Sequence, residues 1–256
     1  MMNENKVSVP KVSIIIPTYN EELNIRETLL AIKNQKCNIT YEVIVSDGQS
    51  TDNTVKIAEK LAKTIISPVK GKAYQVNYAV RIANGEILIL LDADTIIPEN
   101  YIQYIYNLFM KNKNLFACSA RFKYTSGIEK VLKIGSKKFS ITPFFFQNTA
   151  LFLYYTARMF LGYPELAGCN ISVRKDIFLK VNGFKDPPKS WGIDKVFSDS
   201  VLFLIKKLKF GKIKTINSIH VLTSARRVSI KKGLKRYIQY HKKKEVYSDL
   251  AKDIEK

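Results

Sequence analysis

The chain has 256 residues, 46% of them hydrophobic, and carries 42 Lys and Arg against 22 Asp and Glu, a net charge of +20. This length and apolar content exclude a disordered chain as the default and suit one sizeable α/β domain. The positive excess predicts attraction to something anionic, such as nucleic acid, an acidic membrane or a phosphorylated substrate.

The first part of the chain alternates predicted strands with predicted helices. Short β-branched and aliphatic runs predict strands at 12–16, 42–46, 64–66 and 86–91. Helical spacing of apolar residues predicts helices at 21–34, 51–62 and 73–83. Strands that alternate with helices over short loops predict a parallel sheet covered on both sides.

The alternation continues and then breaks down. A helix is predicted at 98–110 and a strand at 115–122. Further along, the pattern predicts a strand at 168–173 and helices at 175–181 and 194–207. The tail, 229–256, has the spacing of a basic amphipathic helix, with Ile230, Leu234 and Ile238 near one side.

Two carboxylates follow the most apolar of these strands. Asp92-Ala93-Asp94 comes directly after Ile87–Leu91, where a buried strand leaves the sheet. Ligands of such sheets bind at the carboxyl ends of the strands, and two carboxylates two residues apart can serve one hard divalent cation. An ordinary turn after a strand is equally compatible with the tripeptide, because Asp is common in turns.

Three separated segments together point to a family. They are 16–21 (Ile-Pro-Thr-Tyr-Asn-Glu), 46–48 (Ser-Asp-Gly) and 92–94 (Asp-Ala-Asp), each after a predicted strand. With these segments the chain resembles family two of the GT-A-fold glycosyltransferases, from about Val12 to Arg227. Later matches are the segments 168–171, 181–184, 198–202 and 223–227.

The resemblance implies a Rossmann-like, mostly parallel sheet flanked by helices, and an inverting enzyme that uses a nucleotide-diphosphate sugar. It implies that the donor pocket is formed by Pro17, Thr18, Tyr19, Glu21, Asp92 and Ala93. Asp47 corresponds to the residue that accepts a hydrogen bond from the base, although a turn-forming Asp is the alternative. Lys72 and Asn77 correspond to residues facing the ribose or diphosphate, where Lys72 could equally be a solvated lysine.

The resemblance also implies a divalent cation, Mg²⁺ or Mn²⁺. Asp94 would ligate the cation directly, and Asp92 would lie nearer the ribose or a metal-bound water. His220 is placed like a histidine that serves as a third ligand in some relatives, and an ordinary histidine is the alternative. An imidazole ligand would favour manganese over magnesium.

Asp199 corresponds to the family's catalytic base, and a carboxylate that merely suits a helix N-terminus is the alternative. The acidic residue usual just before the base is Ser198 here, a departure that bears on acceptor handling. Gly168, Cys169 and Asn170 would shape the acceptor side, with Cys169 packed rather than nucleophilic. Arg226 and Arg227 would fold over the diphosphate, although a basic surface pair has the same sequence pattern.

The predicted organisation is a transferase domain at 1–227, with a nucleotide-sugar half (12–123) and an acceptor half (124–227), followed by the basic helix at 228–256. The aromatic segment 141–163 is interrupted by Pro143 and Arg158 and falls short of the roughly 20 apolar residues of a spanning helix, so we expect a buried or interfacial helix.

The expected location is cytoplasmic. Cys37, Cys118 and Cys169 are odd in number and far apart, which indicates a reducing compartment, and residues 1–11 lack a signal-peptide stretch. Residues 205–256 hold 16 Lys and Arg against 4 Asp and Glu, and this basic tail suggests a peripheral position on an acidic membrane surface. The expected acceptor is a glycan or a lipid-linked molecule.

Three other functions are weighed against this one. A nucleic-acid-binding protein fits the charge, but the basic residues form no known nucleic-acid-binding signature, so no nucleic-acid partner is expected. A nucleotidyltransferase would have a glycine-rich basic loop after the first strand, where this chain has Pro-Thr-Tyr-Asn-Glu. A non-catalytic relative would have lost acidic positions that this chain keeps.

Overall fold

The structure is a computed structural model of the chain. It describes residues 9–125, 164–185 and 192–224, the backbone of 130–134 and 137–141, and residues 149, 153, 156, 157 and 160. The predicted tail helix, Arg226 and Arg227 lie outside the described residues, as does most of the aromatic segment. No helix among the described residues is long and apolar enough to cross a membrane.

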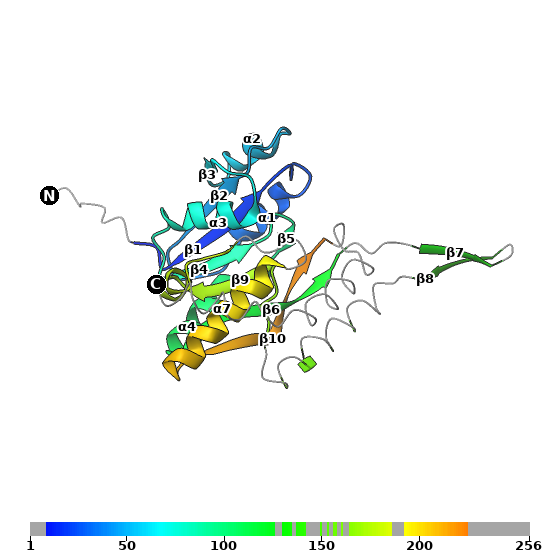
Figure 1. Cartoon of the computed structure of the whole chain (residues 1–256). Coiled ribbons are helices and arrows are strands. Elements are labelled where there is room, and N and C mark those ends of the chain that lie inside the picture. The colour runs from blue at the N-terminus through cyan, green and yellow to red at the C-terminus, as the bar shows by residue number, and fades with distance from the viewer. Residues whose placement is uncertain are drawn as a thin grey trace.

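One sheet organises the molecule (Figure 1). Among the described residues it has eight strands in the order β3-β2-β1-β4-β9-β6-β10-β5. Their bounds are β1 Val12–Thr18, β2 Tyr41–Asp47, β3 Lys63–Ile66, β4 Ile87–Leu91, β5 Thr95–Ile96, β6 Leu115–Tyr124, β9 Asn170–Arg174 and β10 Lys212–Thr223. A separate antiparallel hairpin consists of β7 Lys130–Ile134 and β8 Lys137–Ile141.

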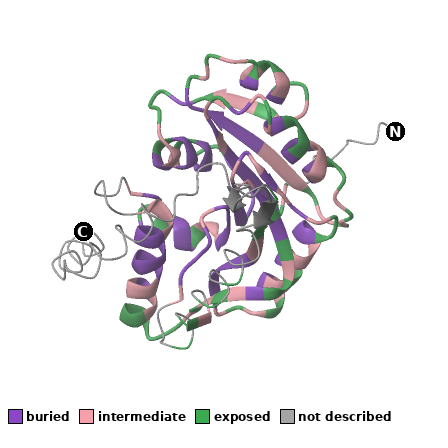
Figure 2. Cartoon of the chain, turned by 90° about the vertical axis from the view of Figure 1, so that its right-hand side faces the viewer, coloured by how far each residue is buried: buried purple, intermediate pink, exposed green. Residues whose placement is uncertain are grey.

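Helices cover both faces of the sheet, as predicted. Buried side chains of α1 (Ile25–Lys33), α2 (Thr54–Ala58) and α4 (Tyr101–Lys111) belong to one core cluster. Those of α3 (Lys72–Val80), α6 (Lys175–Lys180) and α7 (Ile193–Leu208) belong to the other. Figure 2 shows the buried strands between helices whose outer faces are exposed.

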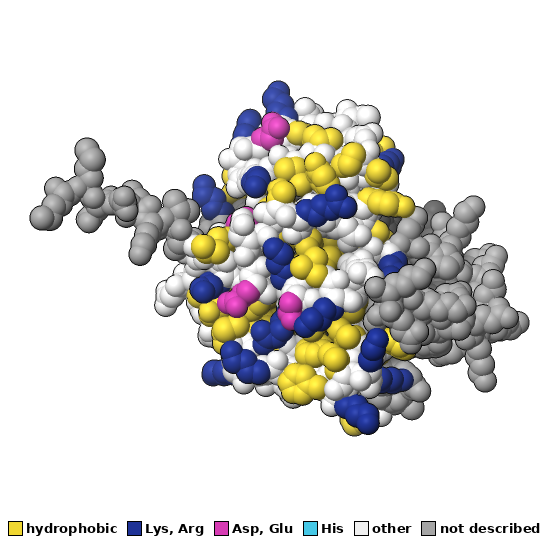
Figure 3. All heavy atoms as spheres, turned by 60° about the vertical axis from the view of Figure 1, so that its left-hand side comes forward, with side chains coloured by type: hydrophobic (Ala, Val, Ile, Leu, Met, Phe, Trp, Pro, Cys, Tyr) yellow, Lys and Arg dark blue, Asp and Glu magenta, His cyan; other side chains and the backbone are white. Residues whose placement is uncertain are grey.

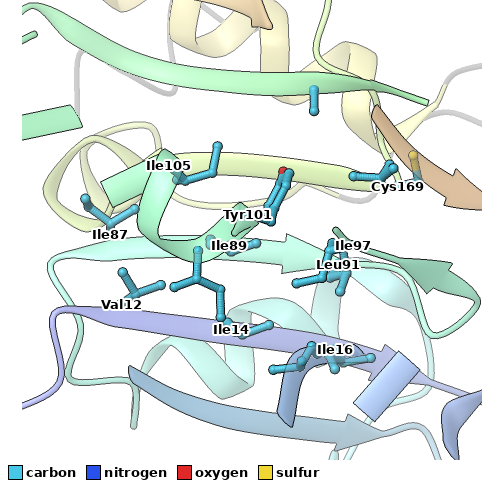
Figure 4. Close-up of a cluster of buried hydrophobic side chains, with 14 of the residues drawn as sticks. Val12, Ile14, Ile16, Ile87, Ile89, Leu91, Ile97, Tyr101, Ile105 and Cys169 are labelled. Atoms are coloured by element: carbon cyan, nitrogen blue, oxygen red, sulfur yellow. The ribbon is translucent and has the colours of Figure 1, made fainter. Parts of the chain in front are cut away.

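The alternation of side chains along β1 explains the two clusters. Val12, Ile14 and Ile16 lie in the first cluster, and Ile15 lies in the second. Figure 4 shows the first three in the same cluster as Ile89 of β4 and Tyr101 of α4. A strand covered on both faces has apolar residues on both of them, and the polar residue within 12–16, Ser13, is buried with its hydroxyl donating to Glu42 (2.6 Å).

The predicted fold class is confirmed, with two local differences. The run ending at Pro17 was expected to stop there, but β1 continues to Thr18 along β2 while its pairing with β4 ends at Ile15. Proline has no N–H to donate, so it is tolerated beyond the end of that ladder. The hairpin β7-β8 and the two-residue strand β5 were not predicted.

The direction of β9 determines which segments lie side by side at the edge of the sheet. β1, β4, β6 and β10 are parallel, whereas β9 runs antiparallel between β4 and β6. The segment that enters β9, Gly168 and Cys169, therefore lies at the edge where β4 and β6 end. Residues 50 to 96 positions apart in the sequence are joined by hydrogen bonds at this edge.

Gln75 of α3 ties two strand ends together at this edge. Its buried Nε2 donates hydrogen bonds to the carbonyl oxygens of Thr18 (2.6 Å) and Ser46 (2.8 Å). Its Oε1 accepts a bond from the N–H of Gly71 at the start of the same helix (3.3 Å). One side chain thus joins the ends of β1 and β2 to α3.

We expect Gln75→Ala to lower the free energy of unfolding by about 1–3 kcal/mol, because two buried carbonyl groups lose their side-chain donor. Urea denaturation measures the change. Gln103→Ala is the control, since the hydrogen bonds of Gln103 are exposed and its loss should cost about 0.5 kcal/mol or less. Equal stability of the two variants would contradict the bridging role.

Candidate active site

A cavity of about 720 Å³ opens at the edge where β1, β4, β6 and β10 end. Its walls come from both predicted halves of the chain. They are formed by Pro17, Thr18, Tyr19, Glu21, Lys70, Gly71, Lys72, Gln75, Asp92, Ala93, Asp94, Phe122, Tyr124, Gly168, Cys169, Asp194, Thr223 and Ser224. Most of the residues predicted for the donor pocket are therefore gathered in one place.

The turn that carries Asp92 and Asp94 is fixed by hydrogen bonds. The N–H of Asp92 donates to the carbonyl of Cys169 (3.1 Å), and the hydroxyl of Thr28 donates to the carbonyl of Ala93 (2.8 Å). The hydroxyl of Thr223 donates to Asp94 Oδ1 (3.4 Å). The turn holds both carboxylates at the cavity wall, while the Ala93 side chain packs in the core.

Lys72 forms an ion pair with Asp92 and also donates to the carbonyl of Gly168 (2.9 Å). Burial alone would lower the pKa of Lys72. The negative charges of Asp92 and Asp194, with the hydrogen bond to Asp92, outweigh it and raise that pKa above its usual value. Lys72 is therefore a fixed cation inside the cavity rather than a solvated lysine.

Asp194 is a cavity carboxylate that the sequence prediction missed, as it missed Lys70 and Gln75. It lies in the first turn of α7 and contacts the segment before β9 so closely that a Cβ at Gly168 would be 3.0 Å from its carboxyl carbon. Burial raises its pKa, the positive charge of Lys72 lowers it in part, and Asp92 raises it further. The signal available in the sequence was an acidic residue two positions after Gly192, at a predicted helix start.

Asp199, the predicted base, has a different environment. Its carboxylate accepts hydrogen bonds from Lys195 one turn earlier on α7, and the two side chains are 5% and 10% exposed. Asp199 does not line the cavity described above. Along α7 it is five positions after Asp194, which turns the two carboxylates about 140° apart around the helix axis.

The end of the cavity near β1 has the features of the predicted base pocket. Tyr19 presents its ring there, with the Lys70 ammonium 3.3 Å from the ring centroid. Glu21 is 4% exposed and accepts a hydrogen bond from Asn24 (3.1 Å). Pro17 and Thr18 complete this wall.

Asp47 does not reach the cavity, although it was predicted to accept a hydrogen bond from the base. It is fully buried, and its carboxylate accepts bonds from the hydroxyl of Thr18 (2.8 Å) and from the N–H and hydroxyl of Ser50 (2.7 and 2.6 Å). These partners satisfy both oxygens. In this structure Asp47 holds the turn after β2 against the end of β1.

Two asparagines that were predicted as site residues form hydrogen bonds with backbone groups and do not line the cavity. Asn77 of α3 donates to the carbonyl of Phe184 (2.7 Å) and accepts from its N–H (2.9 Å). Asn170, fully buried, accepts from the N–H of Ala120 (2.6 Å) and donates to its carbonyl (3.2 Å). Both are structural in this state, because their amides are committed to β-sheet and turn backbone.

His220 is not brought to Asp92 and Asp94. It is exposed on β10 opposite Arg121, after a shift in register between Ile216 and His220. Burial and the positive charges of Lys123 and Arg121 lower its pKa. Among the described residues, no cluster of three or more His, Cys, Asp or Glu could hold a metal ion.

Asp92 and Asp94 alone nevertheless suit Mg²⁺ or Mn²⁺ bound together with a substrate. Mg²⁺ is usually held by one or two carboxylates plus substrate phosphates and waters, not by a cage of protein ligands. The cavity beside the pair leaves room for such phosphates. The donor set is all oxygen, which fits either cation.

Cys169 lines the cavity, but its thiol is not a nucleophile. Burial, with the charge of Asp92, raises its pKa to about 12, so the thiolate is absent near neutral pH. The prediction that Cys169 is a packed residue agrees with its 9% exposure. The three cysteines are free thiols.

Comparison with known proteins gives a consistent result. The model of a family described as "Glycosyl transferase family 2" matches residues 13–181. An uncharacterized glycosyltransferase, YfnE of Bacillus subtilis, is 34% identical over 119 residues, 44% of this chain and 30% of that protein. A dolichol-phosphate mannosyltransferase of Pyrococcus furiosus is 32% identical over 118 residues, 44% of this chain and 33% of that protein.

Solved structures share the fold. The mannosyltransferase PcManGT from Pyrobaculum calidifontis, in complex with GDP-Man and Mn²⁺, has a TM-score of 0.65 and 21% identity over 91% of this chain and 62% of that one. S. aureus TarS 1–349 in complex with UDP has a TM-score of 0.60 and 20% identity over 88% and 63%. The chain spans only 30–45% of the length of the first curated relatives it matches.

We expect Asp199→Ala to lower the free energy of unfolding by about 3–5 kcal/mol, because it removes one partner of the buried Lys195–Asp199 ion pair. Chemical denaturation measures the loss. The double variant Lys195→Met/Asp199→Leu removes both charges and should recover most of it. An Asp199→Ala protein of unchanged stability that has lost activity would instead support Asp199 as the base.

Proposed function

The chain belongs to glycosyl transferase family 2, and we propose that it transfers a sugar from a nucleotide-diphosphate sugar to an acceptor hydroxyl with inversion at the anomeric carbon. One observation carries the proposal. A single cavity holds the Asp92 and Asp94 carboxylates, the half-buried Asp194 and the Tyr19 ring together.

The donor is proposed to bind along the cavity from β1 toward β6. Its base lies against Tyr19, and its diphosphate lies beside Asp92 and Asp94. Structural neighbours were solved with GDP-Man, UDP and UDP-GlcNAc, which supports a nucleotide-sugar donor and makes uridine and guanosine the bases to test. Asp47 would reach the base only if Thr18 and Ser50 released it.

A divalent cation, Mg²⁺ or Mn²⁺, fits the charge of the site. The cavity walls contain four carboxylates, Glu21, Asp92, Asp94 and Asp194, and two ammonium groups, Lys70 and Lys72. A diphosphate would add negative charge to this excess. Asp94, with Asp92, would hold the cation, which would neutralise charge developing on the departing nucleoside diphosphate. Mn²⁺ accompanies the ligands of two structural neighbours.

Asp194 is the proposed general base in place of the predicted Asp199. Its carboxylate lines the cavity, whereas that of Asp199 is paired with Lys195. Asp194 would remove the proton of the acceptor hydroxyl while that oxygen forms a bond to the anomeric carbon. The bond from that carbon to the phosphate oxygen breaks on the opposite face, so one displacement inverts the configuration.

The acceptor and the membrane surface are proposed to contact the protein outside the donor cavity. A glycan or lipid-linked acceptor would enter on the side of Gly168, Phe122 and Tyr124. Figure 3 shows Lys and Arg side chains spread over one face with few acidic ones, which suits a peripheral position on an acidic cytoplasmic membrane surface. Arg226 and Arg227, outside the described residues, remain proposed partners of the diphosphate.

We expect release of nucleoside diphosphate from a uridine- or guanosine-diphosphate sugar to require Mn²⁺ or Mg²⁺ and to stop with EDTA. Asp94→Asn should reduce the rate by about 100-fold or more, because charge on the leaving group loses its neutralisation. The measurement is a coupled diphosphate assay over a donor panel. Pyrophosphate release would indicate a nucleotidyltransferase, and no nucleotide binding would favour a nucleic-acid-binding or non-catalytic protein.

We expect Asp194→Asn to lower kcat by about 10²–10⁴-fold with intact donor binding, because the base is lost. The wild-type rate should fall as the pH drops through the pKa of Asp194. Since burial raises that pKa, this acid limb lies above the range of an ordinary aspartate. The exposed Asp176→Asn is the matched control. An unchanged rate and pH profile in Asp194→Asn would contradict the assignment.

A further inference from the structure

Lys70 is a cation at the cavity wall that lies on an aromatic ring. It is exposed in the loop between β3 and α3, and its Nζ is 3.3 Å from the centroid of the Tyr19 ring. No ion pair between described residues includes Lys70. The ammonium therefore faces a neutral partner in a cavity whose walls carry an excess of carboxylates.

The other lysine of the cavity has a different role. Lys72 is held by Asp92 and by the carbonyl of Gly168, so a ligand could recruit it only by breaking an ion pair. Lys70 would give up only the ring of Tyr19. Among the described cavity residues, Lys70 is thus the cation whose transfer to an anionic ligand costs the fewest protein contacts.

We propose that Lys70 is a phosphate-binding residue, which leaves the Tyr19 ring and binds the diphosphate of the incoming nucleotide. The inference rests on the proposed function, because it requires a nucleoside diphosphate in this cavity. A cation over a ring at an exposed site is weakly held, whereas hydrogen bonds from an ammonium to phosphate are roughly twice as strong as neutral ones. The exchange therefore favours the ligand-bound position.

The backbone beside Lys70 suits this movement. Gly71 has φ +137°, a conformation that side-chain-bearing residues rarely adopt, and it begins α3 at the cavity wall. Gly71 is hydrogen-bonded to Gln75 through its N–H (3.3 Å) and its carbonyl (3.0 Å), so the start of the helix stays in place while the exposed Lys70 side chain moves. Rotation of the long Lys70 side chain alone supplies part of the reach.

The movement would also change the surface available to the nucleotide base. While the ammonium lies over Tyr19, it covers one face of the ring. Once the ammonium binds phosphate, that face becomes free for stacking by the nucleotide base, an interaction that tolerates any base. The same lysine would thus link recognition of the diphosphate to the opening of the base pocket.

The test compares the affinity of nucleoside, nucleoside monophosphate and nucleoside diphosphate by calorimetry with Mn²⁺ present, using uridine and guanosine series. We expect Lys70→Met to weaken diphosphate binding by about 10-fold and to leave nucleoside affinity equal or higher, because only the phosphate contact is lost. Lys70→Arg should restore most of the diphosphate affinity. The matched control is Lys60→Met, an exposed lysine outside the cavity.

The outcomes separate this inference from the proposed function. Unchanged diphosphate affinity in Lys70→Met, or an equal loss for nucleoside and diphosphate, would overturn the phosphate-binding role while wild-type binding upholds the donor site. Failure of the wild-type protein to bind either series would overturn the proposed function itself and this inference with it.

Discussion

The antiparallel strand β9 is the constraint on which the site depends. It joins β4 to β6, and only because it runs against them does its entering segment lie at their carboxyl ends. The amide of Asn170 then fixes this segment to the backbone of Ala120, and the carbonyl of Cys169 holds the N–H of Asp92. A parallel strand at this position would place Gly168 and Cys169 at the opposite edge. Asp92 and Asp94 would then lack the neighbouring Gly168–Cys169 segment, which Lys72 and Asp194 contact.

The sequence predicted the strands and helices better than the functions of single residues. β1 to β4 and the helices between them were predicted because apolar runs and helical spacing are local properties. The cavity positions of Tyr19, Asp92 and Asp94 followed from the rule that loops after parallel strands share an edge. The hairpin β7-β8 and the antiparallel direction of β9 were not predicted, because pairing direction depends on contacts distant in sequence.

Roles that depend on side-chain partners were the hardest to predict. Asp47 follows a strand as Asp92 does, yet Thr18 and Ser50 occupy its oxygens. Asp194 and Asp199 are both acidic residues of one helix, and their spacing shows only that they point in different directions. Which one faces the cavity is decided by how α7 packs in the second core cluster and against β10. His220 lies on β10 after a register shift, which leaves no local mark in the sequence.

The paired hydrogen bonds between Asn77 and residue 184 have a consequence for how this fold can be recombined. The Asn77 amide bonds to the backbone N–H and carbonyl of residue 184. A Cβ at Gly183 would lie 2.5 Å from the amide oxygen of Asn77. The turn and the helix therefore depend on each other, although more than 100 residues separate them in the sequence. A chimera that takes α3 from a homologue must take the Gly183–Phe184 turn with it, whereas the intervening segment can be exchanged independently of that contact.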